Sequence, residues 1–261
     1  MIDIHCHPLP GVDDGATSFE VAVEMCQSAG QDGITHLVAT PHSNYSYTFD
    51  PGLNRQLLTE LQEKVGESPK LLLGCDFHLS YDNIQVCVQD SRDFTINHTS
   101  YLLVELPDQF IPDQLSRVYY DIQVAGLHPI ITHPERNPLL QRKPELLQHW
   151  ISMGCLVQVT AQSYTGGFGS QARKFAEMLL DAGSVHFFAT DAHDTVRRPP
   201  LLSACYRKVA KAKGEEIADL LLRKNPEAVI NGLPLPPQPE DSEDRHPDEE
   251  KRSWFSFLWG R

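Results

Sequence analysis

The chain has 261 residues, of which 41% are hydrophobic and 22% charged, enough for one barrel-sized domain or two small ones. Its formal net charge of -13 argues against general nucleic-acid binding, because an acidic surface repels phosphate backbones. The six cysteines form no Cys-x-x-Cys pair, and neither a signal peptide nor a run of about 20 apolar residues is apparent, so we expect reduced thiols and a cytoplasmic location.

Short apolar runs alternate with helical segments along the chain. The runs predict seven strands, at 2–5, 34–40, 70–74, 101–106, 128–132, 155–160 and 185–190. Helices are expected between them, at 18–31, 53–65, 112–126, 144–153, 170–182 and 200–223. This alternation indicates a parallel sheet, and seven β/α units favour a (β/α) barrel. A doubly wound sheet is the competing fold, but no Gly-x-Gly-x-x-Gly follows the first strand.

The first strand ends in His5-Cys6-His7. Side chains alternate between the two faces of a strand, so His5 and His7 share one face and Cys6 points away from it. Asp14 follows in a Val-Asp-Asp-Gly loop that can fold back toward the same end. The strand therefore offers two imidazoles and a nearby carboxylate to one site.

Similar residues recur where the other predicted strands end. In order these are His42, Asp76, Glu105, His133, Gln158 with Thr160, and Asp191 with His193. Active sites of β/α barrels are built at this face, so we expect these side chains to meet. Three further histidines lie near strand starts and are expected at the opposite face, namely His36, His128 and His186.

The strand ends and the first loop together offer five histidines and four carboxylates. One tetrahedral zinc uses only three or four ligands, so nine fit two or three ions bridged by carboxylates. Mixed imidazole and carboxylate ligands suit manganese, iron or zinc, and the lack of thiolates disfavours structural zinc. The sequence therefore predicts a polynuclear metal centre.

These motifs resemble those of the PHP (polymerase and histidinol phosphatase) superfamily. They are His5-x-His7, Thr-Pro-His42, Glu105, His133-Pro-Glu-Arg136 and Asp191-Ala-His193. The opening MIDIHCHPLPGVDDGA and the later Arg-Arg-Pro-Pro are most similar to the bacterial capsule-type protein-tyrosine phosphatases. The resemblance covers about residues 1–232. It implies a distorted (β/α)7 TIM-like barrel with a trinuclear centre, usually of Mn²⁺.

The resemblance also implies how the ligands are shared. A first ion would be held by His5, His7, Glu105 and Asp191, a second by Asp76, Glu105 and His133, and a third by Asp14, His42 and His193. Relatives typically have glutamate where Asp76 stands here, and the shorter aspartate could change the occupancy or preference of the second site. A metal-bridging hydroxide would be the nucleophile, and Arg136 and Arg198 would bind the phosphoryl group.

The cysteine-dependent class of tyrosine phosphatase can be excluded from the sequence. That class needs Cys-x5-Arg, and none of the six cysteines has an arginine six residues later. Cys6 is therefore interpreted as a buried spacer between two ligands rather than a nucleophile.

The barrel is expected to end at residue 232, because residues 234–261 hold five prolines and seven acidic residues and cannot build a core. We expect disorder through about residue 252. The segment 233–261 ends in an aromatic cluster that could dock a partner or touch a membrane surface, formed by Trp254, Phe255, Phe257, Leu258 and Trp259.

The leading functional hypothesis is a metal-dependent protein-tyrosine phosphatase that regulates capsule or exopolysaccharide synthesis. The resemblance implies a phosphotyrosine protein as substrate, in particular a bacterial tyrosine autokinase. It also implies homo-oligomers, because relatives use glutamates near the first helix, where Glu20 and Glu24 stand here. The alternatives are a small-molecule phosphatase such as histidinol-phosphate phosphatase and a non-catalytic polymerase-type PHP module. The full ligand set and the acidic charge count against the second.

Overall fold

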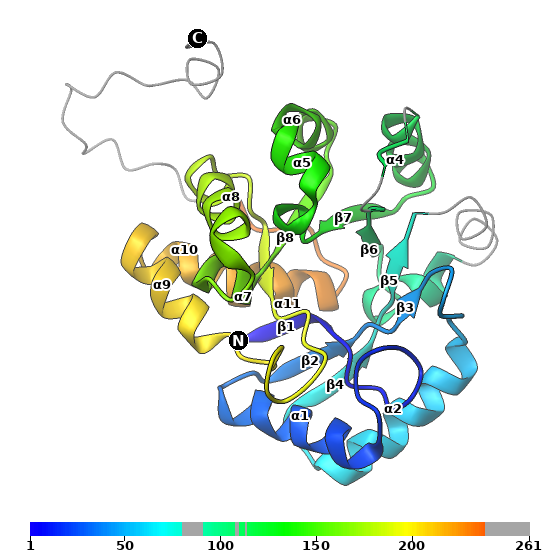
Figure 1. Ribbon diagram of the computed structural model, residues 1–261. Helices are drawn as coiled ribbons and strands as arrows, with labels where there is room; N and C mark the ends of the chain where they lie inside the picture. The colour runs from blue at the N-terminus through cyan, green and yellow to red at the C-terminus, as the bar shows by residue number, and fades with distance from the viewer. Residues whose placement is uncertain (80–90, 108–109, 113, 238–261) are drawn as a thin grey trace.

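The computed structural model describes residues 1–79, 91–107, 110–112 and 114–237, which are drawn in colour in Figure 1. The strands are β1 (Ile2–Cys6), β2 (His36–Ala39), β3 (His42–Ser43), β4 (Lys70–Leu73), β5 (Asp76–His78), β6 (Tyr101–Glu105), β7 (His128–Thr132), β8 (Leu156–Thr160) and β9 (Phe187–Ala189). The α-helices are α1 (Phe19–Gln31), α2 (Pro51–Val65), α4 (Leu115–Val124), α5 (Pro138–Arg142), α6 (Pro144–Ser152), α7 (Ala161–Thr165), α8 (Gly169–Asp181), α9 (Ser203–Lys213), α10 (Glu215–Asp219) and α11 (Asn225–Ile230).

All pairings between these strands are parallel, in the orders β1-β2-β4 and β3-β5-β6-β7-β8-β9. The predicted strands at 34–40 and 70–74 correspond to β2 and β4, and each is followed, after Thr40-Pro41 or Gly74-Cys75, by a short strand that was not predicted, β3 or β5. Proline has no N–H for the ladder, which explains a break at Pro41. When β3 is counted with β2 and β5 with β4, the described residues form the seven strands that the sequence predicts.

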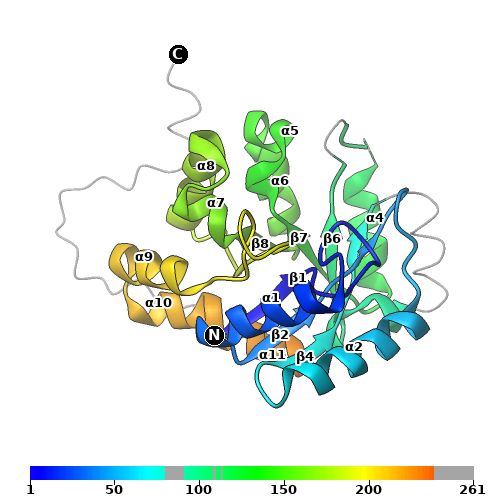
Figure 2. The same ribbon diagram turned by 60° about the horizontal axis from the view of Figure 1, so that its bottom comes forward.

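The barrel closes between its first and last strands. Cys6 pairs with Ala192 in a parallel bridge, and the Asp191 N–H donates to the carbonyl of His5 at 2.7 Å. Below this contact the carboxylate of Asp3, fully buried, accepts from the backbone N–H and the hydroxyl of Thr190 at 3.0 and 2.5 Å. Figure 2 shows the helices arranged around the outside of the strands.

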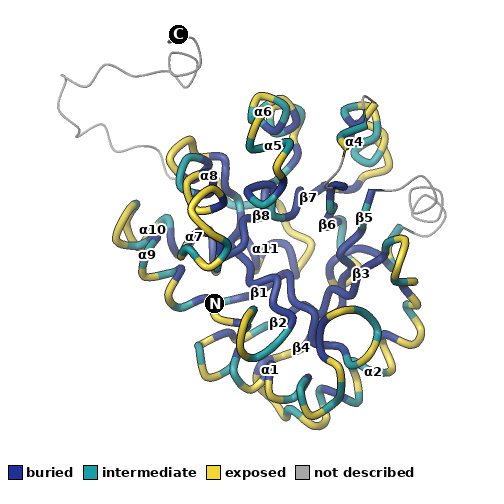
Figure 3. The backbone as a smooth tube through the Cα atoms, viewed as in Figure 1, coloured by how far each residue is buried: buried dark blue, intermediate teal, exposed yellow. Residues whose placement is uncertain are grey.

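The interior of the barrel is apolar only at its N-terminal end. Inward-facing residues of the strands pack there against Val229 and Ile230 of α11, which closes that end. A larger apolar cluster lies between the strands and the outer helices, and the strands are therefore buried on both faces (Figure 3). The C-terminal end of the barrel is lined by the polar residues described below.

Helix positions agree with the prediction except near the end of the barrel. The predicted helix 200–223 is interrupted at Gly214, whose φ of 94° lies in the left-handed region and ends α9. Helical structure then continues past residue 223, through a π-helical turn at Leu220–Lys224 and α11. The short helices α5 and α7 were not predicted, because five-residue helices carry too little periodicity to detect.

The first residues of the predicted tail lie against the N-terminal end of the barrel. The Tyr101 hydroxyl donates to the Leu233 carbonyl at 2.7 Å, and Leu235 packs on the interior cluster. The prediction of disorder is therefore wrong for its first residues, 234–237, which continue from this contact with the barrel. The rest of that segment and the aromatic cluster lie outside the described residues. Across the described ranges, none of the helices has the length and apolar character needed to cross a membrane.

Candidate metal centre

His5 of β1 and His7, just after it, point into the C-terminal end of the barrel, as their spacing predicts. His5 and His7 are 0% and 1% exposed, and their Nε2 atoms lie 3.2 Å apart. Cys6 faces the apolar layer on the other side of the strand. Each imidazole is oriented through Nδ1, in His5 by Gln158 Oε1 at 2.9 Å and in His7 by Asp13 Oδ2 at 2.8 Å. This leaves both Nε2 atoms facing the shared site.

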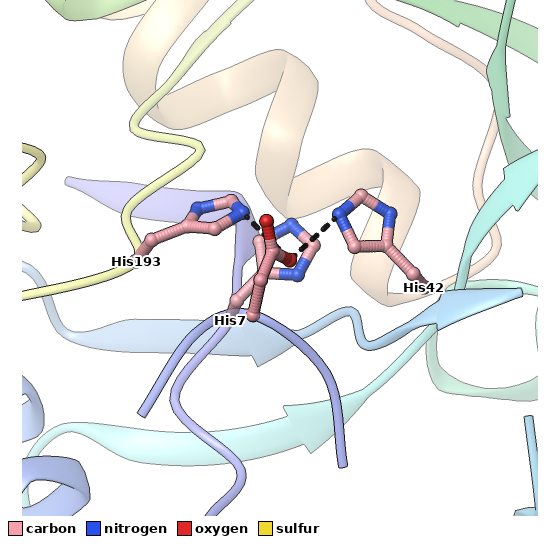
Figure 4. Close-up of side chains that lie close together, drawn as sticks. His7, His42 and His193 are labelled. Atoms are coloured by element: carbon pink, nitrogen blue, oxygen red, sulfur yellow. Dashed lines mark ion pairs between the residues drawn. The ribbon is translucent and has the colours of Figure 1, made fainter. Parts of the chain in front are cut away.

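The loop after β1 folds back over the same end and brings Asp14 to two further histidines. Asp14 Oδ1 lies 3.3 Å from His42 Nε2 and 3.5 Å from His193 Nε2 (Figure 4). The return depends on Gly15, because a Cβ there would lie 2.1 Å from the carbonyl oxygen of His7. Figure 4 shows His7, His42 and His193 pointing toward one another, from just after β1, the start of β3 and the segment after β9.

The carboxylates of the other strands connect these groups. Asp76 Oδ2 lies 3.4 Å from His5 Nε2 and 3.2 Å from His42 Nδ1. Glu105 Oε2 lies 3.6 Å from His42 Nδ1, and its Oε1 lies 3.7 Å from His133 Nε2. Asp191 Oδ1 lies 3.4 Å from His5 Nε2 and 3.4 Å from His7 Nε2. The structure therefore brings all nine predicted residues into one continuous cluster.

Within the described residues, four sets place their ligand atoms close enough to share an ion. They are His7, Asp14, His42 and His193; His5, His7 and Asp76; His5, His133 and Asp191; and His42, Asp76 and Glu105. Several residues belong to two sets, which is expected of neighbouring ions joined by common ligands. The first set contains all three residues of the predicted third group, whereas the other sets divide the ligands differently from the resemblance.

The donor set fits divalent cations because it is left incomplete without them. Both carboxylate oxygens of Asp76 and Nδ1 of His42 are buried without a hydrogen-bond partner. Buried polar atoms are rarely left unpaired, and an ion is one of the groups that can satisfy them. Oxygen and imidazole ligands without thiolate suit Mn²⁺, Fe²⁺ or Zn²⁺.

The charges in the cluster shift the titration of its members in opposite directions. Burial acts to lower the pKa of His5, but the carboxylates of Asp76 and Asp191 outweigh it and raise that pKa to about 9. Burial together with the charge of Asp76 raises the pKa of Glu105 to about 8. Burial, then the charge of Arg136, lowers the pKa of His133 to about 3. Metal cations would replace protons as the positive charges facing these carboxylates.

Two ligand candidates have strained backbones. His133 has a φ of 33° and Asp191 a φ of 51°, both in the left-handed region that residues with a Cβ seldom occupy. His133 lies directly after β7 and Asp191 two residues after β9. Such strain concentrates at functional sites, where surrounding contacts hold the side chain in one direction.

The two predicted arginines lie together at the rim of the cluster. Arg136 Nη1 and Arg198 Nη2 both pair with Oδ2 of Asp191, the second at 2.6 Å. Their side chains are 26% and 24% exposed, so they border both the buried ligands and solvent. Glu135, which could have formed a surface salt bridge with Arg136, is instead fully buried and accepts from the Thr160 N–H at 3.0 Å.

Sequence reasoning missed two residues of this region. Asp13 orients His7 and accepts from the His42 N–H at 3.2 Å, and its signal was the paired aspartates of Val-Asp-Asp-Gly. Phe168 lies beside both arginines, and its signal was the Gly-Gly-Phe-Gly sequence at 166–169. Gln158 was placed at the rim but without a role. The control histidines His36, His128 and His186 lie at strand starts, as predicted.

The cysteines that the structure describes are all buried, and Cys6, Cys26, Cys155 and Cys205 are free thiols. Burial raises the pKa of Cys6 well above its ordinary value, so little of the reactive thiolate would form near neutral pH. This agrees with the exclusion of a thiol nucleophile from the sequence.

The chain is similar to a described protein family and to named proteins. Residues 1–231 match the family described as Capsular polysaccharide synthesis, CpsB/CapC. Tyrosine-protein phosphatase YwqE of Bacillus subtilis is 32% identical over 246 residues, covering 92% of this chain and 96% of that protein. CapC of Staphylococcus aureus is 33% identical over 265 residues, covering 99% of this chain and 100% of that protein.

A solved structure shows the same fold. It is described as YwqE from Bacillus subtilis and CpsB from Streptococcus pneumoniae, unique metal-dependent tyrosine phosphatases. It superposes with a TM-score of 0.84 at 32% identity and covers 92% of this chain and 100% of that chain. The expected barrel is therefore confirmed, and the chain belongs to the CpsB/CapC family.

Proposed function

We propose that this protein is a metal-dependent protein-tyrosine phosphatase that acts in the control of capsule or exopolysaccharide synthesis. One observation carries the proposal: nine imidazole and carboxylate side chains converge at the open end of the barrel, with two arginines at their rim. The relatives named as tyrosine phosphatases support the substrate class. A tyrosyl leaving group has a pKa near 10 and departs more easily than an alkoxide.

The nine residues are proposed as ligands of three divalent ions, most consistent with Mn²⁺. These are His5, His7, Asp14, His42, Asp76, Glu105, His133, Asp191 and His193. Bound ions of this kind supply Lewis-acid activation of water and of phosphoryl oxygens. Metal analysis of protein purified without added metal tests the number and the identity of the ions. An Asp76→Glu variant tests whether the shorter side chain limits occupancy.

Arg136 and Arg198 are proposed to bind the phosphoryl group. A guanidinium matches phosphate oxygens with two parallel hydrogen bonds, and both side chains reach the same point beside Asp191. The other carboxylate oxygen of Asp191, Oδ1, faces His5 and His7. The arginines would therefore hold an incoming phosphoryl group next to the cluster in a fixed orientation.

The decisive experiment compares turnover of a phosphotyrosine peptide with turnover of histidinol phosphate by the metal-reconstituted enzyme. The proposal expects the peptide to be the better substrate, and a clear preference for histidinol phosphate would assign a small-molecule phosphatase instead. Inactivity on both with metal bound would refute the enzymatic function. The variant His133→Ala should lose activity, and full activity in that variant would refute the proposed metal centre.

The biological setting is proposed from the family. A bacterial tyrosine autokinase is the expected phosphoprotein, in the cytoplasm, and recovery of phosphatase activity on a purified phosphorylated kinase tests this. We propose residues 1–232 as the catalytic barrel and 233–261 as an appended tail that docks a partner or a membrane surface. Light scattering tests self-association, and a deletion after residue 237 that alters kinase dephosphorylation but not peptide turnover would support docking by the tail.

A further inference from the structure

Phe168 lies beside both arginines at the rim of the proposed metal centre. Neighbouring strands β7, β8 and β9 are followed by segments that carry Arg136, Phe168 and Arg198 respectively, so the aromatic residue comes from the middle segment. The ring centroid is 4.5 Å from Arg136 Cζ and 5.8 Å from Arg198 Cζ. Both distances are within the range in which the electron-rich face of an aromatic ring attracts a cation.

The local backbone fixes the position of this ring. Gly166 and Gly169 have φ values of 106° and 86°, and a Cβ at Gly167 would lie 2.4 Å from Cγ of Gln162. Gln162 in turn donates to the Arg197 carbonyl at 2.7 Å. The turn that carries Phe168 is therefore tied directly to the segment that carries the second arginine.

A bound phosphate would affect the two kinds of contact that the arginines make, with Asp191 and with Phe168, in different ways. Their bonds to Asp191 Oδ2 are made by the same N–H groups that would turn toward phosphoryl oxygens. The contact with the Phe168 ring is an attraction between the aromatic face and each cation, and it does not depend on a hydrogen-bond acceptor that a phosphate would replace. It is therefore the contact that persists while the hydrogen bonds are exchanged.

We propose that Phe168 is a positioning residue for phosphate recognition, whose ring holds the guanidinium groups of Arg136 and Arg198 in place for an incoming phosphoryl group. The inference rests on the proposed function, since it assigns the arginines to the phosphate. It extends to any phosphate monoester, because the ring acts on the arginines rather than on the leaving group. Its prediction is thus an effect on phosphate affinity, separable from the choice of substrate.

The test measures binding of inorganic phosphate to the metal-loaded full chain by calorimetry. Phe168→Leu keeps an apolar side chain but removes the aromatic face, and Phe168→Tyr keeps that face. We expect the leucine variant to bind phosphate about tenfold more weakly and the tyrosine variant to bind like the parent protein. In turnover, the leucine variant should raise KM more than it lowers kcat, whichever phosphate ester is used.

Two controls separate positioning from packing. Tyr120→Leu removes a similar contact on α4, where Arg117 Cζ lies 5.3 Å from the ring, and should leave phosphate binding unchanged. Combining Phe168→Leu with Arg136→Lys should cost less than the sum of the two single changes, because the ring acts through the guanidinium. Parent-like phosphate binding by Phe168→Leu would overturn the inference, as would loss of metal in that variant. Failure of the parent protein to hydrolyse phosphotyrosine, with the phosphate pattern intact, would count against the proposed function alone.

Discussion

Replacing Asp13 with asparagine should weaken metal binding although Asp13 is not a proposed ligand. Its side chain is 1% exposed, and its oxygens accept three N–H groups, from His7 Nδ1 at 2.8 Å, the His42 backbone at 3.2 Å and the Gly15 backbone at 3.0 Å. An amide of the same shape must turn its NH₂ toward one of these donors. If it faces His7, that imidazole must move its proton to Nε2, the atom that faces the metal cluster.

The size of the effect follows from the role of Asp13 as a partner of a ligand. Loss of such a partner typically reduces metal affinity about 10- to 100-fold, or about 1.4 to 2.7 kcal/mol. The assay is competition for Mn²⁺ between the metal-stripped variant and a chelator. Asp50→Asn is a matched control, since Asp50 accepts from the N–H groups of Gly52 and Leu53 and caps α2 rather than orienting a proposed ligand. That control should lower stability only, and an Asp13→Asn variant with parental affinity would refute the reasoning.

Three further changes test other parts of the structure. Gly15→Ala should displace the loop against the His7 carbonyl, from which its Cβ would lie 2.1 Å, and lower metal content measured after dialysis; parental content would show that the loop yields freely. His186→Asn should flatten the pH dependence of stability. Burial lowers the pKa of His186 to about 4 and its Nδ1 accepts from the Val157 N–H, so the parent protein should lose about 2 kcal/mol of unfolding free energy between pH 7 and pH 5 as the unfolded state takes up a proton first. Urea titrations of the parent protein and the variant at both pH values measure the change in unfolding free energy. An equal change in the two proteins would contradict the assignment. Cys6→Ala should retain turnover of a phosphotyrosine peptide, whereas complete loss with metal still bound would return the thiol to consideration.

The barrel and the clustering of the nine proposed ligands could be predicted because both depend on periodic or type-specific signals. Strand alternation fixes the face of His5 and His7, and parallel strands deliver their C-terminal ends to one rim whatever the connecting helices do. The order of the strands therefore sufficed to gather residues as distant in sequence as Asp14 and His193.

Features that depend on tertiary contacts were not predictable. Asp13 and Asp14 are chemically identical neighbours, and only the direction of the returning loop decides that Asp13 faces Nδ1 of His7 while Asp14 faces His42 and His193. Phe168 is one of many aromatic residues, and its proposed role depends on its contacts with two arginines on other segments. The sharing of ligands among ions depends on distances of a few tenths of an ångström, which sequence spacing does not contain.

The closure of the barrel has a consequence for the order in which this protein becomes active. The hydrogen bond between Asp3 and Thr190 joins residues 187 positions apart. His5 meets Asp191 and His7 meets His193 where the same two strands close the barrel. During synthesis His5 and His7, the first two proposed ligands, emerge early but lack their partners until β9 and the segment after it have been made and docked. Non-local closure of this kind is slow, so metal capture is expected as a late event that locks the finished barrel. A nascent or truncated chain that stops before β9 is then a protein without phosphatase activity.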